Sequence, residues 1–117
     1  MTFSVDSTVL GQASMFDMMG IAWAMGIPWN NTESAKLPHL DHRTCLEMGT
    51  VNGARALGLA DITGSLTPGK RADLLIVRAT DLTMVPFGEV ETVLVNQAAL
   101  ANVDTVAAGG RVLERAG

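Results

Sequence analysis

The chain has 117 residues, of which 48% are hydrophobic and 17% are charged, and its formal net charge is −4. This length fits one modest domain, and the composition argues against a largely disordered chain. The sequence contains no basic run and no basic residues interleaved with aromatic ones, so nucleic acid is not an expected partner.

The compartment is inferred from cysteine usage and hydropathy. Cys45 is the only cysteine, so no internal disulfide can form, as is typical of a reducing compartment. No stretch is long and apolar enough to span a bilayer, and no positively charged segment followed by an apolar one marks a signal peptide. We therefore expect a cytoplasmic chain without a membrane partner.

The first third of the chain predicts a short strand and an apolar helix. Thr2–Val5 alternate weakly and end at Asp6, where polar residues begin. Ser14 and Asp17 have the spacing of a capping box, which predicts a helix over Met15–Met25. This helix is apolar on almost every face, so it should be buried or covered by a partner. We interpret its methionines as core packing rather than as a cofactor site.

The next segment predicts a loop. Gly26–Leu40 contain Pro28 and Pro38, which break a helical pattern. A loop of this length in a compact domain is usually functional or mobile.

A second helix is predicted from Asp41, a good N-cap residue. Its apolar and small residues form one face with the spacing i, i+3, i+4, i+7, i+8, i+11, namely Leu46, Gly49, Thr50, Gly53, Ala54 and Leu57. Gly58 fits the left-handed position after a helix, and Leu59 would complete a Schellman-type cap.

The segment 64–77 predicts a turn between extended segments. Ser65-Leu66 has the pattern of a strand end, and Pro68-Gly69 has the chemistry of a tight turn. Leu74–Val77 is a short, branched, apolar run that predicts a strand buried on both faces. From the pattern alone this is a β-hairpin with a charged corner, made of Lys70, Arg71 and Asp73.

The last part of the chain predicts a closing hairpin. Two short strands, Val103–Ala107 and Arg111–Glu114, flank Gly109-Gly110, and paired glycines are what a type I′ turn requires. Before them we expect irregular structure over Ala79–Gly88, a strand or short helix over Val90–Val95, and a loop or helical turn over Asn96–Asn102.

Three stretches carry a resemblance to a known family. GSLTPGKRADLLIV (64–77) is similar to the C-terminal signature of the amidohydrolase superfamily, in the branch of cytosine, guanine and S-adenosylhomocysteine deaminases and triazine chlorohydrolases. MGTVNGARALGL (48–59) resembles the helix before that signature, and VDTVAAGGRVLERAG (103–117) resembles the closing hairpin after it.

The resemblance implies a fold class of α/β to α+β. A (β/α)8 barrel takes about 250 residues, and the family adds a small β-domain, so this chain is too short for both. We expect residues 1–60 to be the last β/α unit of the TIM barrel of a metal-dependent hydrolase. Residues 61–117 should then be the C-terminal segment of the composite β-sandwich domain.

Asp6 is the candidate catalytic and metal-binding residue. FSVDST (3–8) resembles the end of the eighth barrel strand, where the family's Asp binds a divalent metal, zinc or iron. The same Asp takes a proton from the metal-bound water, which is coherent chemistry for a carboxylate beside a metal. From the six residues alone, a turn cap is the favoured interpretation; the later motifs, which follow in the family's order, favour the metal ligand instead.

Other reactive residues receive structural interpretations. The family's remaining metal ligands are histidines that would precede residue 1, and the match gives His39 and His42 no role. We expect both to be solvated surface residues, with a metal site as the alternative. Cys45 is expected to be a buried thiol, and the charged residues 70, 71 and 73 are expected to be structural.

The functional prediction is a hydrolase that acts on a small heterocyclic, amine-like substrate at a C–N or C–halogen bond. The alternative is a non-catalytic structural or assembly module of the same origin. One carboxylate cannot hold a catalytic zinc, which needs about three protein ligands, so we expect the chain by itself to be inactive. We also expect it to self-associate or to pair with a missing N-terminal portion.

Overall fold

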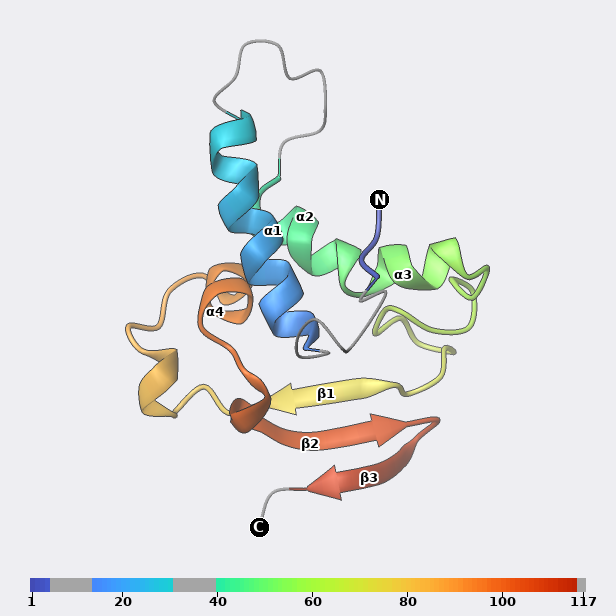
Figure 1. The fold of residues 1–117 in the computed structure, drawn as a ribbon. Coiled ribbons are helices and arrows are strands. Elements are labelled where there is room, and N and C mark those ends of the chain that lie inside the picture. Colours follow the sequence, from blue (N-terminus) through green and yellow to red (C-terminus); the bar gives the residue numbers. More distant parts are fainter. Residues whose placement is uncertain (5–13, 31–39, 116–117) are drawn as a thin grey trace.

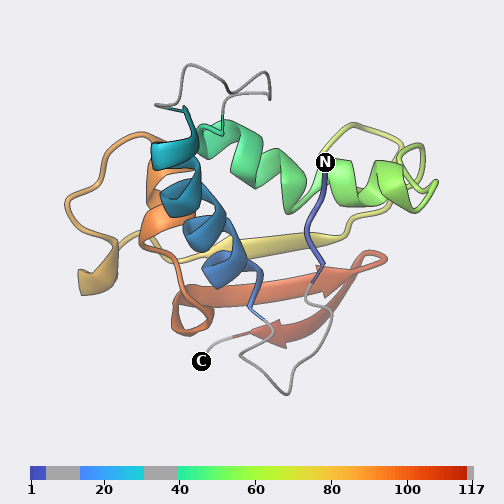
Figure 2. The ribbon, with the colours of Figure 1, turned by 45° about the horizontal axis from the view of Figure 1, so that its top comes forward.

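A computed structural model describes residues 1–4, 14–30 and 40–115, and side chains 28–30 are not described. In these residues the helices lie on one side of a three-stranded sheet (Figure 1, Figure 2). The elements in chain order are α1 (Met15–Asn30), α2 (His42–Met48), α3 (Val51–Ala56), β1 (Leu74–Val77), the 3-10 helix η1 (Leu82–Met84), α4 (Val90–Asn96), the 3-10 helix η2 (Leu100–Asn102), β2 (Val103–Ala108) and β3 (Arg111–Arg115).

The sheet is antiparallel, with the strand order β1-β2-β3. Its closing hairpin is confirmed: Gly109 and Gly110 have φ of +58° and +78°, as a type I′ turn requires. Leu75 pairs with Val106, and Val106 pairs with Glu114, so these three residues form one row across the sheet.

The strand β1 is confirmed over its predicted range, but the prediction that both its faces are buried is wrong. Leu75 and Ile76 are 48% and 50% exposed. The reason is that the buried clusters lie between the helices, so in the described part of the chain no packed layers cover both faces of β1. The strand is also an edge strand, with β2 on one side only among the described residues. Its apolar run therefore does not reflect a central strand covered on both faces.

The turn at Pro68-Gly69 is also confirmed, although the hairpin around it is not. Gly69 has φ +92°, and the Lys70 N–H donates to the Thr67 carbonyl at 3.2 Å. No strand forms at Ser65-Leu66, because β1 pairs with β2 instead.

The helix α1 begins where the sequence predicts and ends later. Ser14 is buried, its Oγ accepts the Asp17 N–H at 3.4 Å, and its carbonyl accepts the Met18 N–H at 3.1 Å. The helix continues through Gly26 and Pro28 to Asn30, so the predicted loop over Gly26–Leu40 is wrong at its start. Proline here removes a donor only near the helix end, and Leu40 packs closely against Gly26.

The single helix predicted from Asp41 is two helices. The N-cap is confirmed, since Asp41 Oδ1 accepts the Thr44 N–H at 2.7 Å. The break falls at Gly49-Thr50, where a Cβ on Gly49 would lie 3.1 Å from Met19 Sδ. Close packing of α1 thus coincides with the break, and the predicted apolar face is not continuous, because Leu57 is 75% exposed.

The end of α3 matches the predicted Schellman cap. Gly58 has φ +71°, the Leu59 N–H donates to the Ala54 carbonyl at 2.8 Å, and the Gly58 N–H donates to the Arg55 carbonyl at 3.1 Å. Glycine is favoured at this position because residues that carry a side chain rarely adopt a positive φ.

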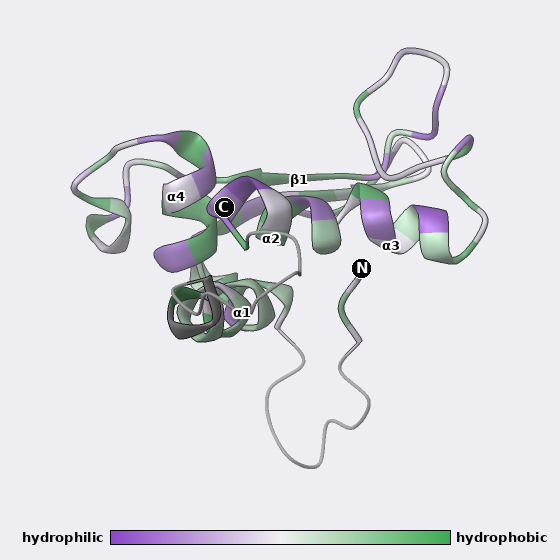
Figure 3. Cartoon of the chain, turned by 90° about the horizontal axis from the view of Figure 1, so that it is seen from above, coloured by the Kyte–Doolittle hydropathy of each residue, from purple (hydrophilic) through white to green (hydrophobic). Residues whose placement is uncertain are grey.

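The core consists of two buried clusters between the helices. One contains Met19, Cys45 and Val95, the other contains Met84, Val93 and Ala98, and Phe16 of α1 packs against both. Val93 and Val95 lie on α4, so the ambiguous segment 90–95 is a helix. Seen from above, α1 is the outermost layer, with α2 and α4 between it and β1 (Figure 3).

Residues 2–4 do not form the predicted strand. In the described part of the chain these residues lie beside the end of α2, where Thr2 Oγ1 donates to the Met48 carbonyl at 3.0 Å. Val5, the last residue of that predicted strand, lies outside the described residues. Among the helices described, none is long and apolar enough to cross a membrane.

Candidate functional site

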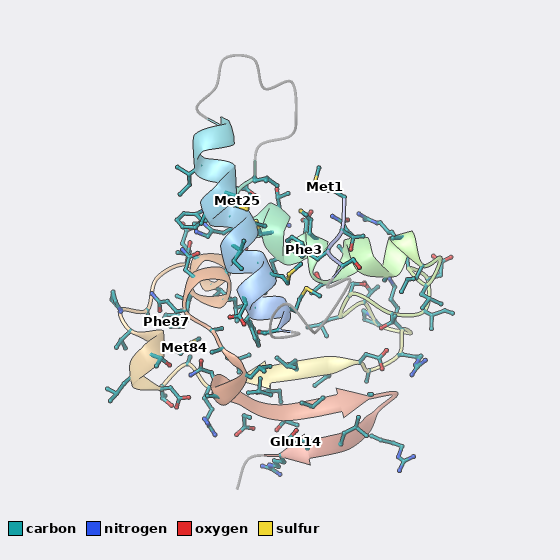
Figure 4. The ribbon with its side chains drawn as sticks, in the orientation of Figure 1. Met1, Phe3, Met25, Met84, Phe87 and Glu114 are labelled. Carbon is teal, nitrogen blue, oxygen red and sulfur yellow. The ribbon has the colours of Figure 1, made fainter. Side chains whose placement is uncertain are left out.

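The candidate catalytic residue Asp6 lies outside the described residues, but the described stretches before and after it are both fixed to the helical layer. Thr2 is bonded to the end of α2, and Phe3 packs against the cluster of Met19, Cys45 and Val95 (Figure 4). Ser14 caps α1, which packs against the same cluster. Residues 1–4 and the start of α1 are therefore held on one scaffold.

His42 of α2 contacts two other helices rather than lying free in solvent. Its ring stacks on Trp23 of α1, with centroids 4.6 Å apart and planes 23° apart. Its Nε2 lies 3.0 Å from Asn96 Nδ2, and its Nδ1 lies 3.4 Å from Thr92 Oγ1, both on α4. His42 is half-buried, so the prediction of a solvated surface histidine is wrong for this residue.

The alternative metal role for His42 lacks partners in the described residues. They contain no group of three or more His, Cys, Asp or Glu side chains that could hold a metal ion. His39, the other histidine of that motif, lies outside the described residues. The side chains described here therefore do not fit a metal by themselves, and any family-type metal site needs ligands beyond them.

Cys45 is the buried thiol that the sequence predicts. Its side chain is fully buried between α1 and α4, beside Met19 and Val95. Burial, with a smaller contribution from the Asp41 carboxylate, raises the pKa of the Cys45 thiol. Because the thiolate is the nucleophile, this environment makes Cys45 unreactive.

The charged corner before β1 is structural, as predicted. Asp73 accepts the Gly109 N–H at 2.6 Å and the Thr63 hydroxyl at 2.8 Å, and the Arg71 guanidinium lies 3.7 Å from it. The hydrogen bond from Gly109, followed by that from Thr63, lowers the pKa of the Asp73 carboxyl. Lys70 donates to the Ala60 carbonyl. The corner thus ties the 60–73 segment to the closing hairpin.

One polar network was not predicted. Asn102 is 3% exposed, its Nδ2 donates to Asp81 Oδ2 at 2.9 Å and to Thr83 Oγ1 at 2.8 Å, and its Oδ1 accepts the Ala99 N–H at 2.9 Å. Arg78 Nε lies 3.4 Å from the same Asp81 oxygen. The Asn102 bond is the largest cause of the lowered pKa of Asp81.

This network has a structural role, because its described polar groups bond to one another. It joins the two ends of the segment that connects β1 to β2, and it holds η1 against η2. The sequence predicts only irregular structure over Ala79–Gly88, because two of the bonded partners are separated from Asn102 by 19 and 21 positions. The polar side chains of these networks thus hold the described segments in place, and their hydrogen bonds give them a structural role.

The family model of the amidohydrolase family matches residues 1–113 of this chain, which is nearly its whole length.

Two curated relatives show the range of activities among similar proteins. The chain is 46% identical over 68 residues to a 5-methylthioadenosine/S-adenosylhomocysteine deaminase of Moorella thermoacetica. This match covers 58% of this chain and 16% of that protein. It is 37% identical over 70 residues to an S-triazine hydrolase of Gordonia rubripertincta. This second match covers 60% of this chain and 15% of that protein. The chain thus spans about a sixth of the length of these relatives.

A solved structure is similar in both fold and sequence. It is an adenosine deaminase from Xanthomonas campestris with bound zinc, which matches 84% of this chain with a TM-score of 0.75 and 34% identity. The match covers 21% of that protein.

Proposed function

Because this chain belongs to the amidohydrolase family, we propose that it is the C-terminal part of a metal-dependent amidohydrolase of the deaminase and chlorohydrolase type. The observation that carries the proposal is the match to a zinc-bound adenosine deaminase over 84% of this chain at 34% identity. The reaction is hydrolysis at a ring carbon of a small heterocyclic substrate, and it releases ammonia, an amine or halide.

The proposed domain division follows the sequence. Residues 1–60 belong to the end of the barrel, and residues 61–117 belong to the composite β-sandwich domain. Support comes from the profile match, which runs through both parts, and from the three-stranded antiparallel sheet that lies entirely in the second part.

Asp6 is the proposed metal ligand and proton acceptor. When bound, a divalent metal lowers the pKa of its water toward neutrality. The Asp6 carboxylate contributes one ligand and removes a proton from the attacking water. Zinc is the proposed ion, because a zinc-bound adenosine deaminase is the similar structure; iron is the alternative. The other ligands come from the rest of the fold, since the described residues contain no three-ligand cluster.

The proposed substrates are purine-like or triazine-like amines. The names of the two curated relatives support this class, since one is a methylthioadenosine/S-adenosylhomocysteine deaminase and the other is a triazine hydrolase. Both act on nitrogen-rich rings, and hydrolytic attack on a ring carbon that bears a leaving group is common to both substrate types.

A graft tests the proposal. The segment of the Xanthomonas campestris adenosine deaminase that matches this chain is replaced by residues 1–117, and adenosine turnover is measured with zinc present. We expect the graft to be active and the Asp6→Asn graft to lose about two orders of magnitude or more in rate, the scale of a lost general base. Asp61→Asn, the same change at an exposed turn residue outside α1, is the matched control. A folded graft without turnover argues against the proposal.

A further inference from the structure

The helix α1 presents an apolar surface to solvent, which we call the outer face of α1. It consists of Ile21, Ala24 and Met25, spaced as one helical stripe; Ile21 is 58% exposed and Met25 is 69% exposed (Figure 4). Asp17 lies at the N-terminal end of this stripe and is the only charged residue of the helix.

The opposite side of α1 already has its partners. Met19 is buried in the cluster with Cys45 and Val95, and Phe16, Ala22 and Trp23 pack around it. In the view from above, α2 and α4 lie on that side, and the sheet lies beyond them (Figure 3). The outer face of α1 therefore points away from the rest of the described molecule.

The neighbouring helices differ from α1 in what they expose. On α2, Arg43 and Glu47 form an exposed ion pair at 3.3 Å, and on α3 the Arg55 guanidinium donates to Asn52 at 3.0 Å. Hydropathy colouring shows hydrophilic patches on α2, α3 and α4 (Figure 3), whereas α1 contains a single charged residue, Asp17. The exposed sides of α2 and α3 thus have the composition of a solvated surface, and that of α1 does not.

A helix that is apolar on all sides is normally covered on all sides. The size of the relatives points to what covers it. The matched region is only 21% of the zinc-bound adenosine deaminase, so four-fifths of that polypeptide lies outside the match and must pack against it somewhere. In that deaminase the remainder belongs to the same polypeptide as the matched region, so it is present at high effective concentration, which a second copy of the matched region is not.

We propose that the outer face of α1 docks onto the remainder of an amidohydrolase polypeptide, through an apolar and uncharged surface of that remainder. This inference rests on the proposed function, and it adds the location of the contact. It assigns Ile21 and Met25 to a buried interface, while the exposed sides of α2 and α3 stay in water.

Thiol labelling tests the location. Two variants, Met25→Cys and, as the matched control on the charged exposed side of α2, Arg43→Cys, are made in the 117-residue chain and in the graft described above. The Arg43 side chain is 74% exposed. The native Cys45 is fully buried, so the background reaction of this chain is low. Maleimide labelling is followed by mass spectrometry of the peptide that contains each new cysteine.

In the chain at a dilution where light scattering finds a monomer, we expect both new cysteines to react at similar rates. In the folded graft, we expect residue 25 to react at least about tenfold more slowly, as for a group exposed only by local opening, while residue 43 keeps its rate. Equal reactivity of residue 25 in chain and folded graft would overturn the inference. So would a graft that does not fold, because the face would then not fit the surface offered.

Other outcomes identify a different occupant or separate the two proposals. Protection of residue 25 that appears only when the isolated chain dimerises, and not in the graft, means that a second copy covers the face, which contradicts the inference. A folded graft that protects residue 25 but does not turn over adenosine retains the docking surface and removes the proposed function. An active graft in which residue 25 stays reactive supports the proposed function and contradicts the docking of the outer face of α1.

Discussion

Asn102→Ala is the substitution that tests the described packing most sharply. Asn102 is 3% exposed and makes three hydrogen bonds, to Asp81, Thr83 and the Ala99 backbone, at 2.8 to 2.9 Å. At about 1 kcal/mol for each lost bond, the variant should lose about 3 kcal/mol of unfolding free energy. A domain of this size has only about 5–15 kcal/mol in total, so the loss is a large share of its stability.

Urea denaturation followed by circular dichroism measures this loss, with the native chain as reference. Asn52→Ala is the matched control, because Asn52 makes a single exposed hydrogen bond to Arg55. We expect that control to change stability by no more than about 0.5 kcal/mol, as for ordinary surface substitutions. Equal effects of the two substitutions would refute the view that the Asn102 network closes the segment between β1 and β2.

Three further predictions concern the isolated chain. Purified and supplied with zinc, it should not hydrolyse adenosine, cytosine or a triazine, because its described residues contain no three-ligand cluster. Chromatography of the reaction products checks this prediction, and turnover free of contaminating enzyme would contradict it. It should self-associate, because apolar residues lie exposed on α1 and on the edge strand β1; light scattering after size-exclusion chromatography should detect oligomers, and a monodisperse monomer at high concentration would be the opposite result. It should lose stability in acid, because the Asp73 pKa is lowered below its ordinary value of 3.8 by the Gly109 N–H. That stabilisation is present at pH above about 4 and is lost as pH falls through the folded-state value, so Asp73→Asn should lower the urea midpoint at pH 7 and flatten its acid dependence; an unchanged profile would remove Asp73 from this role.

Local sequence chemistry predicts the elements whose determinants lie close together in the chain. The Gly109-Gly110 turn, the Pro68-Gly69 turn and the Gly58 cap need only the backbone freedom of their own residues. All three occur as predicted, with positive φ at each glycine.

Elements fixed by distant partners were not predictable in the same way. The break between α2 and α3 at Gly49 depends on Met15 and Met19 of α1, some 30 residues away in the sequence. The position of β1 at the sheet edge depends on strand order, which the apolar run Leu74–Val77 cannot reveal, since buried and edge strands can share that composition.

The candidate site shows the same division. The family resemblance carried by residues 64–77 is confirmed by the amidohydrolase profile. The proposed role of Asp6 rests only on that resemblance, because from the six residues FSVDST alone a turn cap is the favoured interpretation. The Trp23–His42 stack was not foreseen, since it joins two helices across a stretch that reads as a loop.

The most direct test of the central claim is the ratio of adenosine turnover between two grafts, Asp6→Asn and Asp61→Asn. Both remove one carboxylate charge from the same chain, so the comparison isolates the position of the group. If this chain is the C-terminal part of a metal-dependent amidohydrolase, the Asp61→Asn graft keeps its rate and the Asp6→Asn graft falls about a hundredfold or more below it. Equal rates for the two grafts would contradict the account.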